Sequence, residues 1–416
     1  MATVVLIGTL DTKGEEYAWL AERVRRHGAR TVMVDVGPLS VPAEAPEGPW
    51  EAWIDAAEVA RAAGTEQETL RAAGDRGAAM TAMASGAAEV ALRLYAEGRL
   101  DAVLAVGGSG GSSVAARAMR ALPVGVPKLL VSTMASGDVS PYVGEADVTV
   151  MHAVVDVAGV NSVSAQIFGN AAAAASAMAS EHEARRAAPP AVERPLVGLS
   201  MFGLTTPAVD EARAELTALG YEPLVFHATG AGGRALEKLA RDGRLAGVLD
   251  LTTTELADDL VGGVLSAGPH RLEAAGTRGI PQVVSLGALD MVNFGPRESV
   301  PAQFAERRFL VHNPTVTLMR TTVEENAELG RRIGAKLTAA RGPVTLLLPL
   351  RGVSGIDADG GPFRDEAADA ALFAAVREAV AGSAVEVTEE EAHLNDPGFG
   401  ARAARKLHAH ITATGA

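Results

Sequence analysis

Short apolar runs alternate with longer stretches of helical periodicity from one end of the chain to the other. The apolar runs lie at residues 4–7, 31–34, 102–106, 128–131, 196–199, 224–226, 247–249, 282–285, 344–348 and 385–387. The helix candidates between them include residues 15–26, 76–97, 112–121, 207–219, 323–336 and 365–380. Continuous apolar runs are typical of strands buried on both faces. Their alternation with helices predicts an α/β protein with mostly parallel sheets covered by helices.

Residues 181–195 interrupt this alternation with a charged stretch that holds the only Pro-Pro pair of the chain. Each flanking stretch restarts with an apolar strand, which predicts an N-terminal domain over residues 1–183, a linker over 184–195 and a C-terminal domain over 196–416. The last helix, residues 400–411, could pack on either domain. Residues 38–64, which contain several prolines and two tryptophans, read as an insertion or a long loop.

Composition narrows the classes of function. The 37 basic and 51 acidic side chains leave a net charge of −14, which disfavours a nucleic-acid binder. The chain has no cysteine, so disulfides, thiolate catalysis and iron–sulfur clusters are excluded. No apolar run approaches the ~20 residues that span a bilayer, and the first residues lack the pattern of a signal peptide. We therefore expect a cytoplasmic protein without a membrane partner.

A first glycine-rich turn, residues 8–14, follows the apolar run 4–7 and directly precedes a helix. The amides of a helix N-terminus, a lysine and two threonines suit a phosphate group, although the order of residues is not that of a P-loop. A tight turn with a surface lysine is the alternative interpretation. The candidate cofactor-binding residues of this turn are Gly8, Thr9, Asp11, Thr12 and Lys13.

A second glycine-rich turn joins the apolar run 102–106 to the helix candidate 112–121. Its glycines can take left-handed angles and bring consecutive amides to one point, which predicts an anion-binding nest for phosphate. A polar segment after the next strand should open on the same edge of the sheet. Magnesium needs only one or two carboxylates beside phosphate, which Asp11 and Asp138 offer. The further candidate cofactor-binding residues are Gly107, Gly108, Ser109, Gly110, Gly111, Ser112, Thr133, Ser136 and Gly137.

The second half carries polar clusters next to its predicted strands. His312 and His393 are the candidates for acid/base catalysis, because histidine titrates nearest neutral pH. Asp290 and Asp396 are candidates to orient them or to hold substrate. Arg271 and Arg320 are candidate ligands for an anion. Each could instead be a turn or structural residue, and no zinc-binding spacing of histidines occurs.

These motifs resemble those of a bacterial uncharacterised protein family homologous to the ATP-binding N-terminal region of the tomato mosaic virus resistance protein. The resemblance covers nearly the whole chain. Its carriers are GTLDTKG (8–14), DRGAA (75–79), GGSGGS (107–112), the segment 119–144, VVDVAGVN (154–161), the segment 250–276, GALDMVNFG (287–295), HNPTVTLMRTT (312–322) and HLNDPGF (393–399).

The resemblance implies two tandem Rossmann-like domains, ATP and Mg²⁺ as ligands, and a homodimer. It also implies a separate TIM-barrel protein as a possible partner, because the plant protein continues into such a domain. The chain departs from the family pattern at Ser109 and Ser112 in the glycine-rich turn. It also has Ser162 and Ala165 where the family carries arginines, and His152 where tyrosine or proline is usual. These departures point to a different acceptor substrate or to another pathway.

The leading hypothesis is an ATP·Mg-dependent enzyme that activates a small carboxylate- or hydroxyl-bearing metabolite by phosphoryl or adenylyl transfer. The first domain is expected to hold the nucleotide and the second the substrate, with the chemistry in an interdomain cleft that closes around both. The alternative is a nucleotide-gated binding or regulatory protein without turnover. The residues do not decide between these readings.

Overall fold

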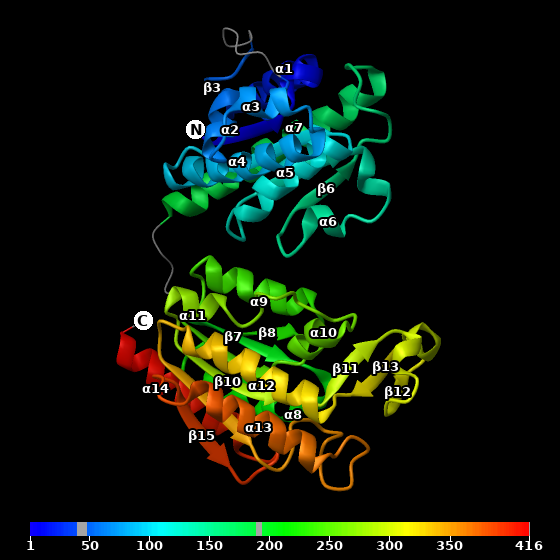
Figure 1. Ribbon diagram of the computed structural model, residues 1–416. Helices are drawn as coiled ribbons and strands as arrows, with labels where there is room; N and C mark the ends of the chain where they lie inside the picture. The colour runs from blue at the N-terminus through cyan, green and yellow to red at the C-terminus, as the bar shows by residue number, and fades with distance from the viewer. Residues whose placement is uncertain (40–47, 189–193, 416) are drawn as a thin grey trace. The chain divides into compact units, whose positions relative to one another are not determined.

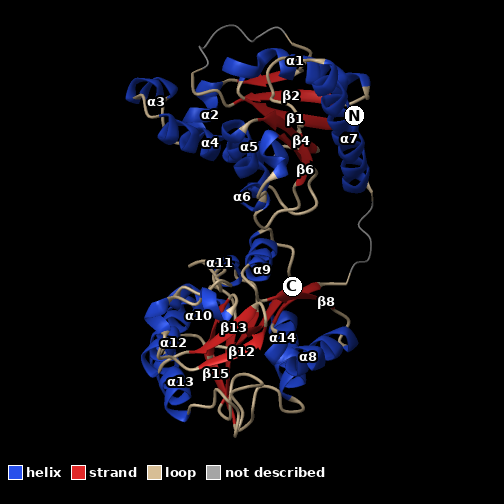
Figure 2. Cartoon of the chain, turned by 90° about the vertical axis from the view of Figure 1, so that its right-hand side faces the viewer, coloured by secondary structure: helices blue, strands red, loops and turns tan. Residues whose placement is uncertain are grey.

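The structure is a computed structural model that describes residues 1–39, 48–188 and 194–415. The chain divides into two compact units, Met1–Ala191 and Val192–Ala416. Each unit is a six-stranded parallel sheet with helices on both faces (Figures 1 and 2). The predicted fold class, an α/β protein with two mostly parallel sheets, is confirmed.

The N-terminal sheet has the strand order β3-β2-β1-β4-β5-β6, which is the Rossmann order. Its strands are β1 (Thr3–Gly8), β2 (Arg30–Asp35), β3 (Ala52–Ile54), β4 (Ala102–Gly107), β5 (Lys128–Ser132) and β6 (Thr149–His152). Its helices are α1 (Leu10–Arg26), α2 (Ala56–Ala62), α3 (Gln67–Ala73), α4 (Arg76–Ala96), α5 (Ser109–Ala121), α6 (Ser140–Val143) and α7 (Ser162–Ala187), with a 3₁₀ turn η1 (Thr133–Ser136).

The side chains of β1 and β4 alternate between two apolar cores, so both strands are apolar throughout. Val5 and Val103 face the core made with α2, α4 and α5, whereas Val4 and Leu104 face the core made with α1 and α7. Figure 2 shows these two helical layers on opposite sides of the sheet. Burial on both faces is the physical reason why parallel strands read as continuous apolar runs.

The C-terminal sheet has the order β15-β14-β10-β9-β7-β8, and β11, β13 and β12 form a separate antiparallel sheet. The strands are β7 (Leu196–Met201), β8 (Glu222–His227), β9 (Gly247–Thr252), β10 (Gln282–Gly287), β11 (Met291–Phe294), β12 (Phe309–Asn313), β13 (Val316–Arg320), β14 (Val344–Pro349) and β15 (Glu386–Glu390). The helices are α8 (Thr206–Ala218), α9 (Ala231–Arg241), α10 (Glu255–Val261), α11 (Ala274–Arg278), α12 (Val323–Thr338), α13 (Glu366–Val380) and α14 (Phe399–Thr414), with 3₁₀ turns η2 (Gly203–Thr205), η3 (Arg297–Ser299) and η4 (Ala302–Phe304).

The structure describes the last helix and parts of the predicted linker and insertion. The last helix, α14, packs on α8 and β9 within the C-terminal unit. Helix α7 continues to Ala187, so the first residues of the predicted linker 184–195 are helical, and its residues 189–193 lie outside the described residues. Within the predicted insertion 38–64, residues 40–47 also lie outside, and the remainder supplies β3 and α2. No helix in the described part of the chain is long and apolar enough to cross a membrane.

Candidate functional site

The N-terminal sheet reverses its order between β1 and β4. From β1 the sheet continues to β2 and β3, and from β4 it continues to β5 and β6 on the other side. Helix α1, which follows β1, covers one face, and α5, which follows β4, covers the other. The two connecting turns therefore leave the carboxyl edge in opposite directions, and open α/β sheets bind their ligands in the crevice formed there.

Tyr17 of α1 bridges β1 and β4 at this edge of the sheet. Strand β1 pairs with β4 from Val4 to Leu6. Beyond this pairing, the Tyr17 hydroxyl lies 2.6 Å from the carbonyl of Ile7 and accepts a hydrogen bond of 2.9 Å from the amide of Val106. The ring rests on Gly8, where a Cβ atom would overlap it. Burial raises the pKa of the Tyr17 hydroxyl well above its usual value, so it stays protonated. Gly8 is thus needed for packing.

The second glycine-rich turn is the start of helix α5. Gly108 is the N-cap and provides no side-chain cap. The amide of Ser112 donates to the carbonyl of Gly108, but the amides of Ser109, Gly110 and Gly111 meet no acceptor in the described part of the chain. The prediction of a left-handed nest is wrong, because none of the glycines between 107 and 111 has a positive φ. The amides are instead exposed by an uncapped helix N-terminus.

The first glycine-rich turn begins helix α1, and most of its amides are already used. Asp35, at the end of β2, accepts a hydrogen bond of 3.1 Å from the amide of Leu10. The amides of Thr12 and Lys13 donate to the carbonyl of Thr9. The chain kinks at Lys13, whose φ of −137° is not helical. The start of α5 therefore offers more amides without acceptors than the start of α1 does.

A cavity of about 310 Å³, which we call the phosphate pocket, lies where both turns meet. Residues of both glycine-rich turns line this one cavity. Of its lining residues, Lys13 donates to the carbonyl of Val157, and Asp11 accepts from the amide of Leu39 at 3.3 Å. The pocket is lined by Thr9, Asp11, Thr12, Lys13, Pro38, Leu39, Arg76, Met80, Gly108, Ser109, Gly110 and Gly111.

Arg76 is a pocket residue that the sequence prediction missed. It is the first residue of α4, and its Nη2 lies 3.9 Å from the position that a Cβ on Gly110 would occupy. Its side chain is exposed and has no hydrogen-bond or ion-pair partner among the described residues. Arg76 lies in the motif DRGAA at residues 75–79, which was a signal for this position. The motif does not show that the start of α4 lies beside the start of α5. Arg76 and the amides of α5 together make the pocket attractive to an anion.

The other predicted cofactor-binding residues do not line the phosphate pocket. Ser112 is fully buried, and its hydroxyl lies 2.7 Å from that of Ser132, so it joins α5 to β5. Gly8 is buried under Tyr17. Asp138 accepts from the amide of Ser140 at 2.9 Å, and hydrogen bonding to Ser140 lowers the pKa of the Asp138 carboxyl. Thr133 is half-buried in η1, whereas Ser136 and Gly137 are exposed beside Asp138. Of the two candidate metal ligands, only Asp11 lines the pocket.

Arg271 of the C-terminal domain is buried among carboxylates. Its side chain is fully enclosed, and its guanidinium nitrogens contact Glu237, Asp250 and Glu255. Nε lies 2.7 Å from Glu255 Oε2, and Nη2 lies 2.7 Å from Asp250 Oδ1. All three nitrogens are therefore engaged by the protein itself. We do not propose Arg271 as a ligand for substrate.

Asp290 and Arg320 meet in a second buried cluster. The hydroxyl of Ser354 donates to Asp290 Oδ2 at 2.8 Å, and Arg320 Nη2 lies 2.8 Å from Asp369 and 3.6 Å from Asp357. Desolvation raises the pKa of Asp290 to about 6 and that of Asp357 to about 8. One oxygen of Asp290 and one of Asp357 have no hydrogen-bond partner in the described chain. Because these carboxyl groups are buried, their protonation affects the stability of the fold.

The two candidate histidines lie in different surroundings. His393 Nε2 lies 2.8 Å from the carbonyl of Ser354, and Nδ1 accepts from the amide of Asn395 at 3.0 Å. Asp396 accepts from the His393 amide at 2.8 Å and so closes the same turn. His312 is exposed on β12 of the antiparallel sheet. The structure thus joins His393, through Ser354, to the buried cluster of Asp290 and leaves His312 apart from it.

Models of one family match both units. The C-terminal domain of "Uncharacterised protein family (UPF0261)" matches residues 194–411, and the N-terminal domain of the same family matches residues 2–184.

Similar proteins occur in bacteria and in a plant. A UPF0261 protein of Clostridium tetani is 48% identical over 404 residues, which are 97% of this chain and 98% of that protein. A UPF0261 protein of Rhizobium meliloti is 46% identical over 96% of both chains. The ToMV resistance protein Tm-1(GCR237) of Solanum lycopersicum is 40% identical over 89% of this chain, which spans 50% of that protein. The chain belongs to the uncharacterised protein family UPF0261.

Proposed function

We propose that the N-terminal domain binds ATP with Mg²⁺ at the phosphate pocket, and that the protein uses it to activate a small metabolite. The observation that carries the proposal is the group of three α5 amides without acceptors, with the unpaired Arg76 beside them. Helix N-termini bind phosphate through such amides, and an arginine adds charge-assisted hydrogen bonds. The pocket at the point where the strand order reverses is where Rossmann-like sheets bind nucleotides.

The residues around the pocket fit the rest of a nucleotide. A second cavity of about 210 Å³ shares Pro38, Leu39 and Arg76 with the phosphate pocket and continues toward Leu70 and Ala79. Its apolar side chains suit a nucleobase. Asp11 is the carboxylate on the pocket wall that suits Mg²⁺, a cation that prefers oxygen ligands. ATP supplies the phosphoryl or adenylyl group that activates a carboxylate or a hydroxyl.

These residues could support phosphoryl transfer by positioning the phosphates and neutralising their charge. Phosphoryl transfer depends chiefly on holding the phosphates and neutralising their charge, and the α5 amides, Arg76 and Lys13 can do both. Neither His312 nor His393 lines the phosphate pocket. That observation also favours the second candidate, a nucleotide-gated binding protein without turnover. The similarity to the plant ToMV resistance protein is in keeping with it.

The binding test uses the full chain and calorimetric titration with ATP and Mg²⁺. Gly110→Val places a branched side chain beside Met80 Cε and Arg76 Nη2, which lie 3.4 and 3.9 Å from the Cβ position. It should abolish binding while the protein stays folded by circular dichroism. Arg76→Ala should weaken binding by about 10- to 150-fold, since a charged hydrogen bond contributes roughly 1.5–3 kcal/mol. The matched control is Arg61→Ala, an exposed arginine of α2 outside the pocket. Wild-type affinity in a folded Gly110→Val variant would refute the proposal.

Turnover is tested separately by phosphorus NMR of ATP with a panel of carboxylate and hydroxyl metabolites. Formation of ADP would identify phosphoryl transfer, and formation of AMP would identify adenylyl transfer. Intact ATP in the presence of every candidate, together with measurable binding, would favour the nucleotide-gated binding protein.

The resemblance also leads us to propose a homodimer and a separate TIM-barrel protein as a partner. Sedimentation of the purified chain tests the first, and co-purification with the TIM-barrel protein tests the second. A monomer at micromolar concentration would contradict the homodimer.

A further inference from the structure

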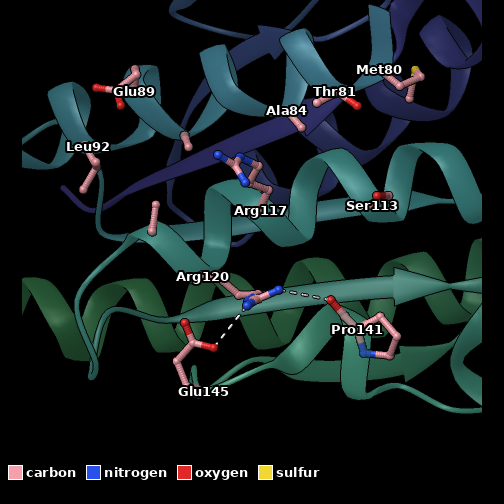
Figure 3. Close-up of a pocket in the computed structure, with 12 residues that line it drawn as sticks. Met80, Thr81, Ala84, Glu89, Leu92, Ser113, Arg117, Arg120, Pro141 and Glu145 are labelled. Atoms are coloured by element: carbon pink, nitrogen blue, oxygen red, sulfur yellow. Dashed lines mark hydrogen bonds and ion pairs between the residues drawn. The ribbon is translucent and has the colours of Figure 1, made fainter. Parts of the chain in front are cut away.

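A larger cavity of about 560 Å³ lies beside the phosphate pocket, between α4 and α5. We call it the α4–α5 groove, and Figure 3 shows the side chains that line it. Met80 lines both the groove and the phosphate pocket, so the two cavities are neighbours. The groove is large enough for a small metabolite of its own, since ligand sites measure about 300–1,000 Å³.

Arg117 is the available cation of this groove. It is exposed and has no hydrogen-bond or ion-pair partner in the part of the chain that the structure describes. Figure 3 shows it projecting from α5 into the space below α4. Side chains of a helix lean toward its N-terminus, so a guanidinium at Arg117 covers the turn of Ser113. The α carbons of Gly110 and Arg117 are about 10 Å apart along the helix at 1.5 Å per residue.

Arg120 also lines this groove, but its guanidinium already has partners within the protein. Its Nη2 pairs with Glu145 at 3.1 Å, and its Nη1 donates to the carbonyl of Pro141 at 3.4 Å. Gly144 has a φ of +54° and leaves room for the Arg120 side chain, which a Cβ there would strike. We therefore do not propose Arg120 as a ligand for a bound molecule.

Arg117 and Ser113 are the two lining groups that suit an anion. Glu89 is the acidic side chain on the α4 side, and it forms no ion pair with Arg117. The hydroxyl of Ser113 lies exposed one turn before Arg117 on the same face of α5. Together they offer a charge and a hydroxyl to a carboxylate or phosphate.

We propose that the α4–α5 groove is the binding site of a second substrate, a small metabolite with a carboxylate or phosphate group held by Arg117 and Ser113. The opposite end of this molecule faces the phosphate pocket across Met80. The proposal rests on the proposed function, because the second substrate is the acceptor of the group that the nucleotide provides. It places the acceptor in the N-terminal domain, whereas the sequence led us to expect it in the C-terminal domain.

The test measures binding of two probes, citrate and inorganic phosphate, to the full chain by calorimetry, without and with saturating ATP and Mg²⁺. We expect at least one probe to bind the wild-type protein and Arg117→Ala to weaken that binding by about tenfold or more. Arg61→Ala should bind the probe as the wild type does. ATP affinity should be unchanged in Arg117→Ala. The probe that binds distinguishes a carboxylate ligand from a phosphate ligand.

A second variant, Ser113→Phe, fills the groove from the exposed face of α5 and leaves Arg117 in place. It should also lose the probe and retain ATP. Equal probe binding in wild type and a folded Arg117→Ala variant, or no probe binding to the wild type, would overturn the proposal. A parallel loss of ATP would overturn it too, because the groove would then be part of the nucleotide site. If the probe bound in an Arg117-dependent way but ATP did not bind at all, the groove would be supported as an anion-binding site. The proposed ATP-dependent function would then be contradicted.

Discussion

Tyr17 joins the two central strands of the N-terminal sheet through a single hydroxyl group, at the point where their own pairing stops. Its ring lies where a side chain at residue 8 would have to be. Gly8→Ala should therefore displace the ring and lower the free energy of unfolding by about 2–4 kcal/mol, from overpacking and lost hydrogen bonds. Urea denaturation of the full chain measures this.

The control for Gly8→Ala lies in the same turn. Gly14 has no atom within 4 Å of the position of a Cβ and lies within helix α1. Gly14→Ala should leave the free energy of unfolding unchanged or raise it by up to about 1 kcal/mol, the difference in helix propensity. Equal destabilisation by the two substitutions would show that Tyr17 is not the cause.

Asp357 makes stability depend on pH. Its carboxyl is buried, accepts from the amide of Val353 at 2.9 Å, and has a pKa raised to about 8 by desolvation. A raised pKa means that the folded protein holds a proton which the unfolded chain releases above its own pKa of about 4. The free energy of unfolding due to this group therefore falls as pH rises from about 4 through 8.

Asp357→Asn removes this titration and keeps an acceptor for Val353. As pH rises from 6 to 8.5, the free energy of unfolding of the variant should increase relative to that of the wild type. Urea denaturation at several pH values measures it. Glu366→Gln, at a side chain that is 84% exposed, is the control and should keep the wild-type profile. A constant difference across this range would contradict a raised pKa at Asp357.

At the scale of elements, His393 connects two loops that follow neighbouring strands. The loop after β14 contributes the carbonyl of Ser354, and the loop after β15 contributes the amide of Asn395. A glutamine cannot satisfy both partners from one position, so His393→Gln should cost about 1–3 kcal/mol of stability. His312→Asn, on exposed β12, should change stability by less than about 0.5 kcal/mol. Equal unfolding midpoints in urea for these two variants would contradict a structural role of His393.

The elements also show what could be read from the sequence. Strands such as β1 and β4 were predicted because burial on both faces leaves a continuous apolar run, and the glycine-rich turns follow them directly. The antiparallel sheet of β11, β12 and β13 was not predicted, since its short strands are interrupted by turn-forming residues. Tertiary structure alone brings Arg76 beside Gly110 in the N-terminal unit. It likewise brings the carboxylates to Arg271 in the C-terminal unit. A lone arginine in a sequence carries no sign of the partners that the fold brings to it.

At the scale of the whole molecule, each unit has its own apolar cores around its own sheet. The α5 amides and Arg76 belong to the N-terminal unit alone. We therefore expect two thermal transitions by scanning calorimetry, with ATP and Mg²⁺ raising the midpoint of only one. A ligand at one hundred times its Kd adds about 2.7 kcal/mol to the unit that binds it.

Two variants assign that transition. Gly8→Ala should lower the midpoint of the ligand-sensitive transition, because Tyr17 packs in the core of the same unit as the phosphate pocket. Gly110→Val should abolish the shift caused by ATP and leave both midpoints of the unliganded protein near their wild-type values, because its new side chain points into a cavity. If ATP raised the transition that Gly8→Ala leaves unchanged, the nucleotide would bind the C-terminal unit, and the phosphate pocket would have to be abandoned as its site.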